Sequence, residues 1–296
     1  MTAMRTATDT RSGKGHRDEN FPVASRLIRA EHRGPILAFY RFVRAADDVA
    51  DHAMLSADEK LALLDGLEAA LTGAGPPDPE AEPLRAALAE RGLSSRHAID
   101  LLDAFRLDAR KARYRDWSEL MGYCALSAMP VGRYVLDVHG EDRATWAASD
   151  QLCAALQIVN HLQDCGKDYR NLDRVYLPLD ALAAHGASVA DLAAARATPQ
   201  LLAAIHDLSR RTDALLDEGA ALSDQIADLG LALEVAAIHR LSRHLNRGLQ
   251  RRDPLSERVH LAKAGFVAVG LAGIVSALLR RGLRRGARRV AAERGA

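Results

Sequence analysis

Apolar residues recur every three to four positions along almost the whole chain after Val23, which is the spacing of one face of an α-helix. We find no convincing alternation of apolar and polar residues at every second position, which a half-buried β-strand would show. The pattern predicts helices over residues 23–30, 34–51, 56–72, 81–91, 95–112, 116–139, 142–168, 188–196, 199–228, 231–250 and 256–282. Turn residues separate them, most clearly the GAGPPDP segment at 73–79.

The order of these segments favours a single all-α domain, because we see neither a long polar linker nor an internal repeat. Aromatic residues make up only 4% of the 296 residues, and Ala and Leu recur, which favours helices over a sheet. Hydrophobic residues reach 48%, so a sizeable core can form. We expect a flexible lead-in over residues 1–20, a helical domain over 21–279 and a basic, Arg-rich tail over 280–296.

Charge and cysteine content exclude several classes of protein. The net charge is +1, so no overall field attracts nucleic acid. Cys124, Cys153 and Cys165 form no CxxC pair, which argues against a disulfide framework or a zinc site and fits a reducing cytoplasm. Residues 1–20 are polar and predict no signal peptide.

The C-terminal region has an uncharged stretch followed by a basic one. Residues 264–279 are sixteen uncharged residues, fewer than the roughly 20 of a membrane span, so we expect a buried or membrane-surface helix. Beyond residue 279, seven arginines accompany a single acid, Glu293. Two interpretations stand: a solvated, frayed end, or contact with anionic lipid headgroups that would place a cytoplasmic protein at the inner face of the membrane. No aromatic residues interleave with the arginines, which argues against nucleic acid.

The first group of residues with chemical content lies in the helix predicted over 34–51. Asp47 and Asp51 are four residues apart, so their carboxylates leave one face of the helix, beside Asp48 and Arg44. Like charges at this spacing repel, and acids near a helix C-terminus oppose the helix dipole. This arrangement therefore costs stability unless something compensates it.

The second group lies in the helix predicted over 142–168. Gln157, Asn160, Asp164 and Asp168 form one polar stripe along an otherwise apolar sequence. Two acidic helices of this kind fit a hard divalent cation, since Mg²⁺ binds carboxylate and amide oxygens and shares its shell with phosphate oxygens. Two or three Mg²⁺ ions could then be held against one diphosphate and make it a leaving group. Nearby cations that could contact the phosphates are Arg44, Lys167, Arg170 and Arg174.

The two motifs together resemble those of the squalene/phytoene synthase family, whose members join or rearrange prenyl diphosphates. The resemblance rests on DDVAD at 47–51 and NHLQDCGKD at 160–168, and extends to YRFVR at 40–44, YCALSAMPVGR at 123–133 and RVYLP at 174–178. It covers residues 19–261, most of the chain. It implies an all-helical terpene-synthase fold around a central apolar cavity.

The resemblance also implies roles for individual residues. The catalytic set would be Tyr40, Arg44, Asp47, Asp51, Asn160, Asp164 and Tyr176. The Mg²⁺ ligands would be Asp47, Asp48, Asp51, Asn160, Asp164 and Asp168. The diphosphate and substrate contacts would be Asn20, Arg44, Gln157, Lys167, Arg170 and Arg174. No NADPH is expected, and no GxGxxG motif follows a predicted strand.

Within the family, four segments resemble the bacterial branch that forms hydroxysqualene: ENFPVASR at 19–26, PVGR at 130–133, NHLQD at 160–164 and RDPL at 252–255. That branch implies a carbon–oxygen lyase. Presqualene diphosphate would lose its diphosphate, the cation would rearrange, and water would capture it. Met129 and Asp173 depart from the family pattern, where we expect Asn and Gly. The first departure puts the handling of water in doubt, and the second the turn that presents Arg174.

Alternatives stay open at this point. The same fold could condense two farnesyl diphosphates as a transferase, giving presqualene diphosphate or squalene, or could join C20 substrates as phytoene synthases do. A di-iron carboxylate bundle would need two Glu-x-x-His motifs, and Glu257 to His260 is the one match we find. A helical adaptor at a membrane surface would leave both aspartate groups as solvated faces. Contact with neighbouring enzymes of the squalene pathway would suit insoluble intermediates.

Overall fold

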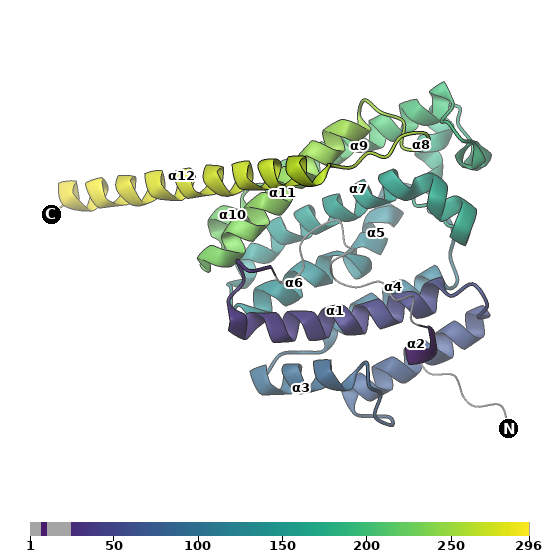
Figure 1. Cartoon of the computed structure of the whole chain (residues 1–296), viewed down its shortest axis with the longest axis horizontal. Helices are drawn as coiled ribbons and strands as arrows, with labels where there is room; N and C mark the ends of the chain where they lie inside the picture. Colours follow the sequence, from purple (N-terminus) through teal and green to yellow (C-terminus); the bar gives the residue numbers. More distant parts are fainter. Residues whose placement is uncertain (1–6, 11–24, 296) are drawn as a thin grey trace.

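The computed structural model describes residues 7–10 and 25–295 (Figure 1), so Asn20 lies outside the described residues. Within these ranges the chain is helical and contains no β-strand, which confirms the all-α class. The elements are η1 (Ala7–Thr10), α1 (Ala30–Asp51), α2 (Ala57–Thr72), α3 (Glu82–Arg91), α4 (Arg96–Asp108), α5 (Trp117–Ser127), α6 (Met129–Val138), η2 (Arg143–Thr145), α7 (Trp146–Leu172), α8 (Leu179–Ala184), η3 (Val189–Ala193), α9 (Pro199–Gly219), α10 (Leu222–Gln225), α11 (Leu229–Leu249) and α12 (Lys263–Gly295).

Several predicted helices have different bounds in the structure. The prediction of a helix over 23–30 was wrong, because residues 25–29 form a turn and α1 begins at Ala30. The Ser25 hydroxyl accepts a hydrogen bond from the Leu27 N–H and donates one to Glu234 of α11, so a distant contact holds this turn. The helix expected over 116–139 is divided at Ala128, which has φ −128°, two residues before Pro130.

Other differences lie in the second half of the chain. The segment 188–196 contains only the 3₁₀ helix η3, the segment 199–228 is divided into α9 and α10, and the short helix α8 was not predicted. The helix expected over 256–282 begins only at Lys263, and the residues before it form a loop. Two contacts hold this loop: Asp253 accepts hydrogen bonds from the Ala197 N–H and the Ser256 hydroxyl, and the Gln163 amide donates to the Val259 carbonyl.

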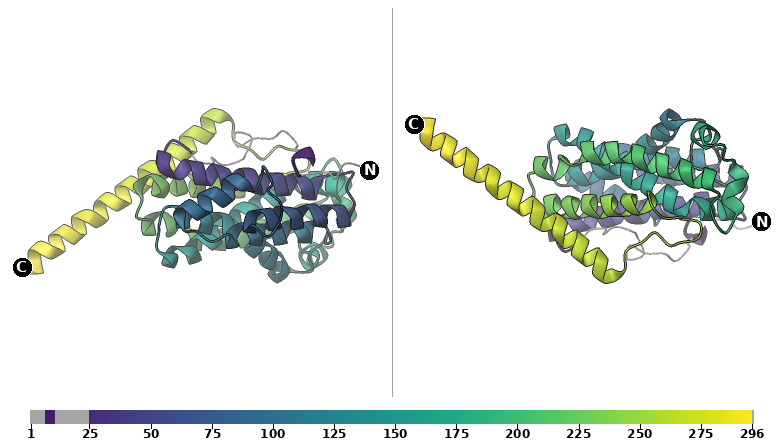
Figure 2. Two further views of the ribbon diagram at one scale, coloured as in Figure 1. Left: turned by 90° about the horizontal axis from the view of Figure 1, so that it is seen from below. Right: turned by 90° about the horizontal axis from the view of Figure 1, so that it is seen from above.

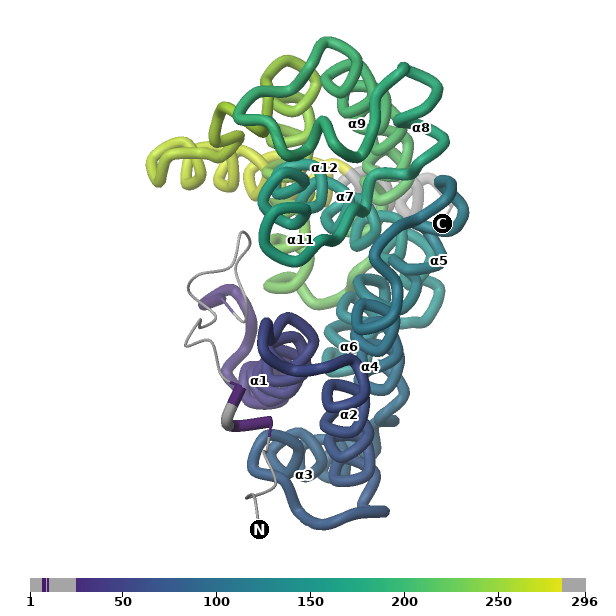
Figure 3. Tube along the Cα trace, turned by 90° about the vertical axis from the view of Figure 1, so that its right-hand side faces the viewer, coloured from purple at the N-terminus to yellow at the C-terminus, as the bar shows by residue number. Residues whose placement is uncertain are grey.

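The helices gather in two groups. Helix α1 packs against α2, α3, α4 and α6, whereas α7 packs against α5, α6, α9 and α11. Figure 3 shows the first helices on one side of the molecule and α7, α9 and α11 on the other, with α4, α5 and α6 beside both groups. Fully buried side chains such as Phe42, Leu102, Val159 and Ile205 form the core. The C-terminal halves of α1 and α7, which carry the two acidic motifs, face one central cavity.

The last helix differs from the others. Helix α12 packs on α11 and α10 and then continues past the bundle to Gly295, as Figures 1 and 2 show. Among the described residues, its Lys263–Leu283 portion is the one helical stretch long and apolar enough to cross a membrane, and only 17% of its most apolar part is buried. The segment expected to be a tail from residue 280 is helical up to Gly295.

Candidate functional site

The central cavity has a volume of about 540 Å³, which is within the usual range of roughly 300–1,000 Å³ for small-molecule sites. Its lining is mostly apolar where the N-terminal halves of α1 and α7 meet α4, α6 and α11, with residues such as Ile36, Phe39 and Leu152. Glu234 of α11 also lines this end, where it accepts a hydrogen bond from the Ser25 hydroxyl. Toward the C-terminal halves of α1 and α7 the lining becomes polar. The polar residues there are Tyr40, Arg44, Asp47, Asp51, Asp108, Tyr123, Gln157, Asn160, His161, Asp168, Arg174 and Tyr176.

The structure separates the three aspartates of the first motif. Asp47 and Asp51, which their spacing predicted to share one face of the helix, both line the cavity. Asp48 instead is buried, and its carboxylate is 2.6 Å from the Arg44 guanidinium, which also lies 2.7 Å from Asp47. Asp48 was expected among the metal ligands, and in this structure its carboxylate pairs with the Arg44 guanidinium.

A second arginine fixes the end of α1. Arg174 is 7% exposed and donates to the Asp51 carboxylate at 2.5 Å and to the Ala50 carbonyl at 2.9 Å. Lys60 of α2 donates to the same carbonyl at 2.8 Å. These cations compensate the carboxylates and the negative end of the helix dipole, which is the compensation that the sequence of α1 requires.

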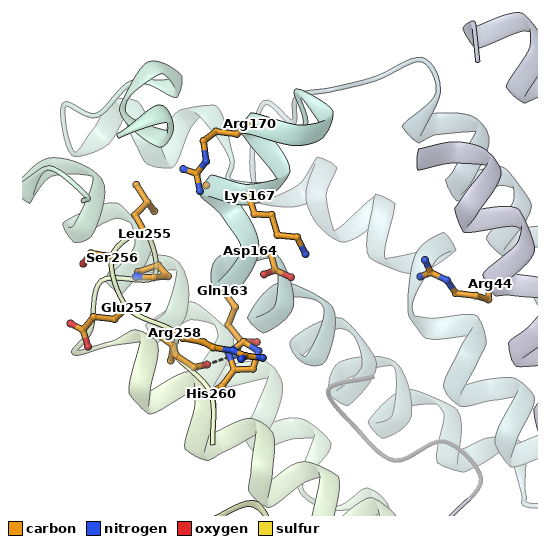
Figure 4. Close-up of a pocket in the computed structure, with 13 residues that line it drawn as sticks. Arg44, Gln163, Asp164, Lys167, Arg170, Leu255, Ser256, Glu257, Arg258 and His260 are labelled. Carbon is orange, nitrogen blue, oxygen red and sulfur yellow. Dashed lines mark hydrogen bonds between the residues drawn. The ribbon is translucent and has the colours of Figure 1, made fainter. Parts of the chain in front are cut away.

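The polar stripe of α7 is shared between two spaces. Gln157, Asn160 and Asp168 line the cavity, whereas Asp164 lines an adjoining cleft of about 740 Å³. Lys167 and Arg170 line the cleft as well, and Arg44 lines both spaces, so cavity and cleft meet there. Figure 4 shows Asp164 and Lys167 extending from α7 into the cleft, with Arg44 facing them from α1.

The carboxyl groups of the site repel one another. Burial and the Asp51 carboxylate raise the pKa of Asp47 to about 7. Burial and the Asp164 carboxylate likewise raise the pKa of Asp168 to about 7. A hard divalent cation would relieve this cost, and the carboxylate and amide oxygens are the donors that Mg²⁺ takes. Among residues 7–10 and 25–295, no three acidic, His or Cys side chains already converge on one point, but the chemistry of the donor set fits the ion.

Aromatic side chains surround an acid that the sequence analysis missed. Asp108, at the end of α4, accepts hydrogen bonds from the hydroxyls of Tyr123 at 2.8 Å and Tyr176 at 2.9 Å. Burial raises its pKa to about 6. His161 stacks on Tyr176 with ring centroids 3.7 Å apart, and burial lowers its pKa to about 3, so it is neutral near pH 7. Tyr40 lines the same cavity from α1.

The turn after α7 tolerates the departure at Asp173. This residue has φ 51° and ends α7 in the left-handed conformation that glycine adopts most easily. Asp is among the few other residues that adopt it readily, and its carboxylate pairs with Arg113 at 2.5 Å. The turn therefore forms without glycine, and Arg174 reaches the site.

A glycine determines how closely α6 approaches α7. A side chain on Gly132 would lie 2.3 Å from the Ser149 hydroxyl and 2.6 Å from the Cys153 sulfur. Met129, the other departure, is the first residue of α6 and packs against the core. Met129 therefore contributes to the packing of α6 against the hydrophobic core.

The chain is similar to known proteins over most of its length. The sequence model of the squalene/phytoene synthase family matches residues 15–264. Hydroxysqualene synthase from Rhodopseudomonas palustris is 56% identical over 96% of this chain and 97% of its own, and that from Sinorhizobium fredii is 52% identical over 96% and 98%. The crystal structure of a squalene synthase from Alicyclobacillus acidocaldarius superposes with a TM-score of 0.67 at 29% identity, over 90% of this chain and 92% of the other.

These matches cover both acidic motifs and every helix that lines the cavity. The fold expected from the resemblance, an all-helical synthase with a central apolar cavity, is confirmed. The chain belongs to the squalene/phytoene synthase family.

Proposed function

We propose that this protein is a hydroxysqualene synthase, a carbon–oxygen lyase that converts presqualene diphosphate into hydroxysqualene. The observation that carries the proposal is one cavity with two chemically different ends. Its apolar end can hold hydrocarbon chains, and its polar end brings Asp47 and Asp51 of α1 opposite Asn160 and Asp168 of α7. Two relatives that are 56% and 52% identical to this chain bear the name hydroxysqualene synthase.

Mg²⁺ would be held by Asp47, Asp51, Asn160, Asp164 and Asp168, and when bound it supplies positive charge that makes diphosphate a better leaving group. Asp48 would act through Arg44, because its carboxylate is buried against that guanidinium. The chain contributes further positive charge from both sides of the opening. Arg44 and Arg174 lie at the cavity, and Lys167 and Arg170 lie in the cleft where a departing diphosphate could stay bound.

Loss of diphosphate leaves a cyclopropylcarbinyl cation in the cavity, and rearrangement follows before water adds. Tyr123, Tyr176 and the neutral ring of His161 present π-electron density beside the reacting end, which favours a cation nearby. Capture by one water molecule forms the carbon–oxygen bond, and the proton released can pass to the bound diphosphate. No hydride is delivered, so no nicotinamide is required.

The experiment is a product assay on the purified chain with Mg²⁺ and without NADPH. Presqualene diphosphate and farnesyl diphosphate are supplied in separate reactions, and extracts are read by mass spectrometry before and after phosphatase treatment. We expect hydroxysqualene from presqualene diphosphate and no consumption of farnesyl diphosphate. Presqualene diphosphate formed from farnesyl diphosphate would instead assign the protein to the condensing branch of the family.

The cellular setting is also a proposal. We place the enzyme in the cytoplasm, since its three cysteines are free. Because substrate and product are nearly insoluble in water, direct transfer between this protein and neighbouring enzymes of the pathway would suit the chemistry. Co-purification of such an enzyme from a membrane-free extract would test this contact.

A further inference from the structure

Between Lys263 and Leu283, helix α12 presents most of its large aliphatic side chains to solvent, whereas Val269 and Ile274 are half-buried. Six of them are between 45% and 75% exposed: Val267, Leu271, Val275, Leu278, Leu279 and Leu283. A surface helix of a water-soluble bundle normally turns its apolar stripe toward the core. In α12 this orientation is inverted.

The opposite face of α12 is made of small residues. Between Lys263 and Leu283 the buried positions are Gly270, Gly273 and Ala277, and the two glycines lie against α11. A side chain on Gly273 would come within 2.6 Å of the Ala236 carbonyl oxygen, so the two backbones are in close contact. A helix rotated to bury its leucines could not approach α11 this closely. The packing itself therefore fixes the aliphatic stripe on the outside.

Positive charge lies at one end of this stripe. No charged residue occurs from Ala264 to Leu279. Arg281 then donates to the carbonyls of Ser223 and Ile226 at 2.7 and 2.8 Å, which ties the helix to the end of α10. Beyond it the sequence continues with five arginines and one acid, on a helix that extends past the bundle in Figures 1 and 2.

We propose that α12 binds an anionic lipid membrane while lying in the plane of its surface. The aliphatic stripe would enter the boundary between headgroups and acyl chains, and the arginines would contact the lipid phosphates. A membrane-spanning arrangement would require α12 to leave α11 and α10. A second copy of this chain is a less favourable occupant of this face, because it would bring two arginine-rich ends into the same assembly. Anionic lipid instead complements their charge.

The test is flotation of the full chain with vesicles, either of phosphatidylcholine alone or of phosphatidylcholine with phosphatidylglycerol. We expect binding to the anionic vesicles, weak binding to the neutral ones, and a loss of binding as salt screens the arginines. Leu279→Glu should weaken binding about tenfold, because it removes a leucine that the membrane would bury and adds repulsion from the anionic lipid. The matched control is Met54→Glu, which adds the same charge at an 80% exposed position between α1 and α2 and should bind like wild type. Circular dichroism of both variants checks the fold.

Four results would overturn the proposal. The wild-type chain could fail to float with anionic vesicles, or Leu279→Glu could bind as tightly as Met54→Glu. Protein that stays with the vesicles after an alkaline carbonate wash would be inserted across the bilayer. A wild-type dimer in sedimentation that Leu279→Glu dissociates, without any vesicle binding, would identify a second copy as the occupant of this face.

Discussion

Asp108 allows a quantitative prediction about pH and stability. Its carboxyl group is buried beside the cavity, where it accepts hydrogen bonds from Tyr123 and Tyr176, and burial raises its pKa from 3.8 to about 6. A tenfold change in a proton equilibrium is worth about 1.4 kcal/mol, so the ionised carboxylate lowers the free energy of unfolding by about 3 kcal/mol. Replacing Asp108 with Asn removes the charge at nearly constant volume.

The sign of the effect follows from the two pKa values. Below pH 3.8 the group is protonated in both the folded and the unfolded chain, so it makes no pH-dependent contribution. Between pH 3.8 and about 6 the unfolded chain loses this proton first, and the wild-type protein loses stability that Asp108→Asn does not lose. The free energy of unfolding of the variant, relative to wild type, should therefore rise by about 3 kcal/mol from about pH 4 to about pH 7, or about 6 °C in Tm.

The assay is thermal and urea unfolding followed by circular dichroism across this pH range, with EDTA present. Asp103→Asn is the matched control, because Asp103 lies on the same helix, is 45% exposed in its side chain and pairs with Arg106 at the surface. We expect no comparable rise for the control. A stability difference between Asp108→Asn and wild type that stays constant with pH, or that shrinks as pH rises, would refute the reasoning.

Three further predictions concern packing and placement. Gly132→Ala should lower the free energy of unfolding by about 1–3 kcal/mol through overpacking against α7, whereas Gly122→Ala on α5, where a methyl group meets nothing within 4 Å, should raise it by about 0.5–1 kcal/mol; urea midpoints measure both. Asp48→Asn should raise the KM for the diphosphate substrate about tenfold and leave the Mg²⁺ concentration for half-maximal rate unchanged, and a shift in the latter would make Asp48 a ligand. Asp173→Ala should be about 1 kcal/mol less stable than Asp173→Gly, because φ there is 51°, and equal urea midpoints would contradict this.

Helix periodicity predicted most of the fold because most helices here bury one face. It failed where a contact distant in sequence determines the local conformation. Ser25 forms its turn with Glu234 of α11, and the loop before α12 is held where Gln163 donates to Val259 and where Asp253 accepts from the Ala197 N–H. Neither contact leaves a periodic signal nearby. The break at Ala128 is different, because its cause is local: Pro130 stands in the first turn of α6.

The candidate site could likewise be predicted only in part from the sequence. Four-residue spacing placed Asp47 and Asp51 on one face, and the structure brings both to the cavity. Spacing could not show that Asp48 is buried against Arg44, or that Arg174 crosses 123 residues of sequence to reach Asp51. Asp108 carried no motif at all, since its role depends on how α4 packs beside two tyrosines.

The pairing of arginines with carboxylates also predicts how ligands should bind. Arg44 is paired with Asp47, and Arg174 with Asp51, so each partner is occupied. Cation binding to these carboxylates would weaken their pairing with the two guanidiniums, while Arg44 stays held by Asp48 and Arg174 by the Ala50 carbonyl. Diphosphate binding to the guanidiniums would likewise leave Asp47 and Asp51 freer to bind the cation. Each ligand should therefore increase the affinity for the other by the same factor. We expect the rise in Tm with Mg²⁺ and inorganic pyrophosphate together to exceed the sum of the separate rises, and Arg174→Gln to reduce this excess. Mg²⁺ and pyrophosphate also associate in free solution, but that association is the same for both proteins, so an undiminished excess in Arg174→Gln would refute the coupling.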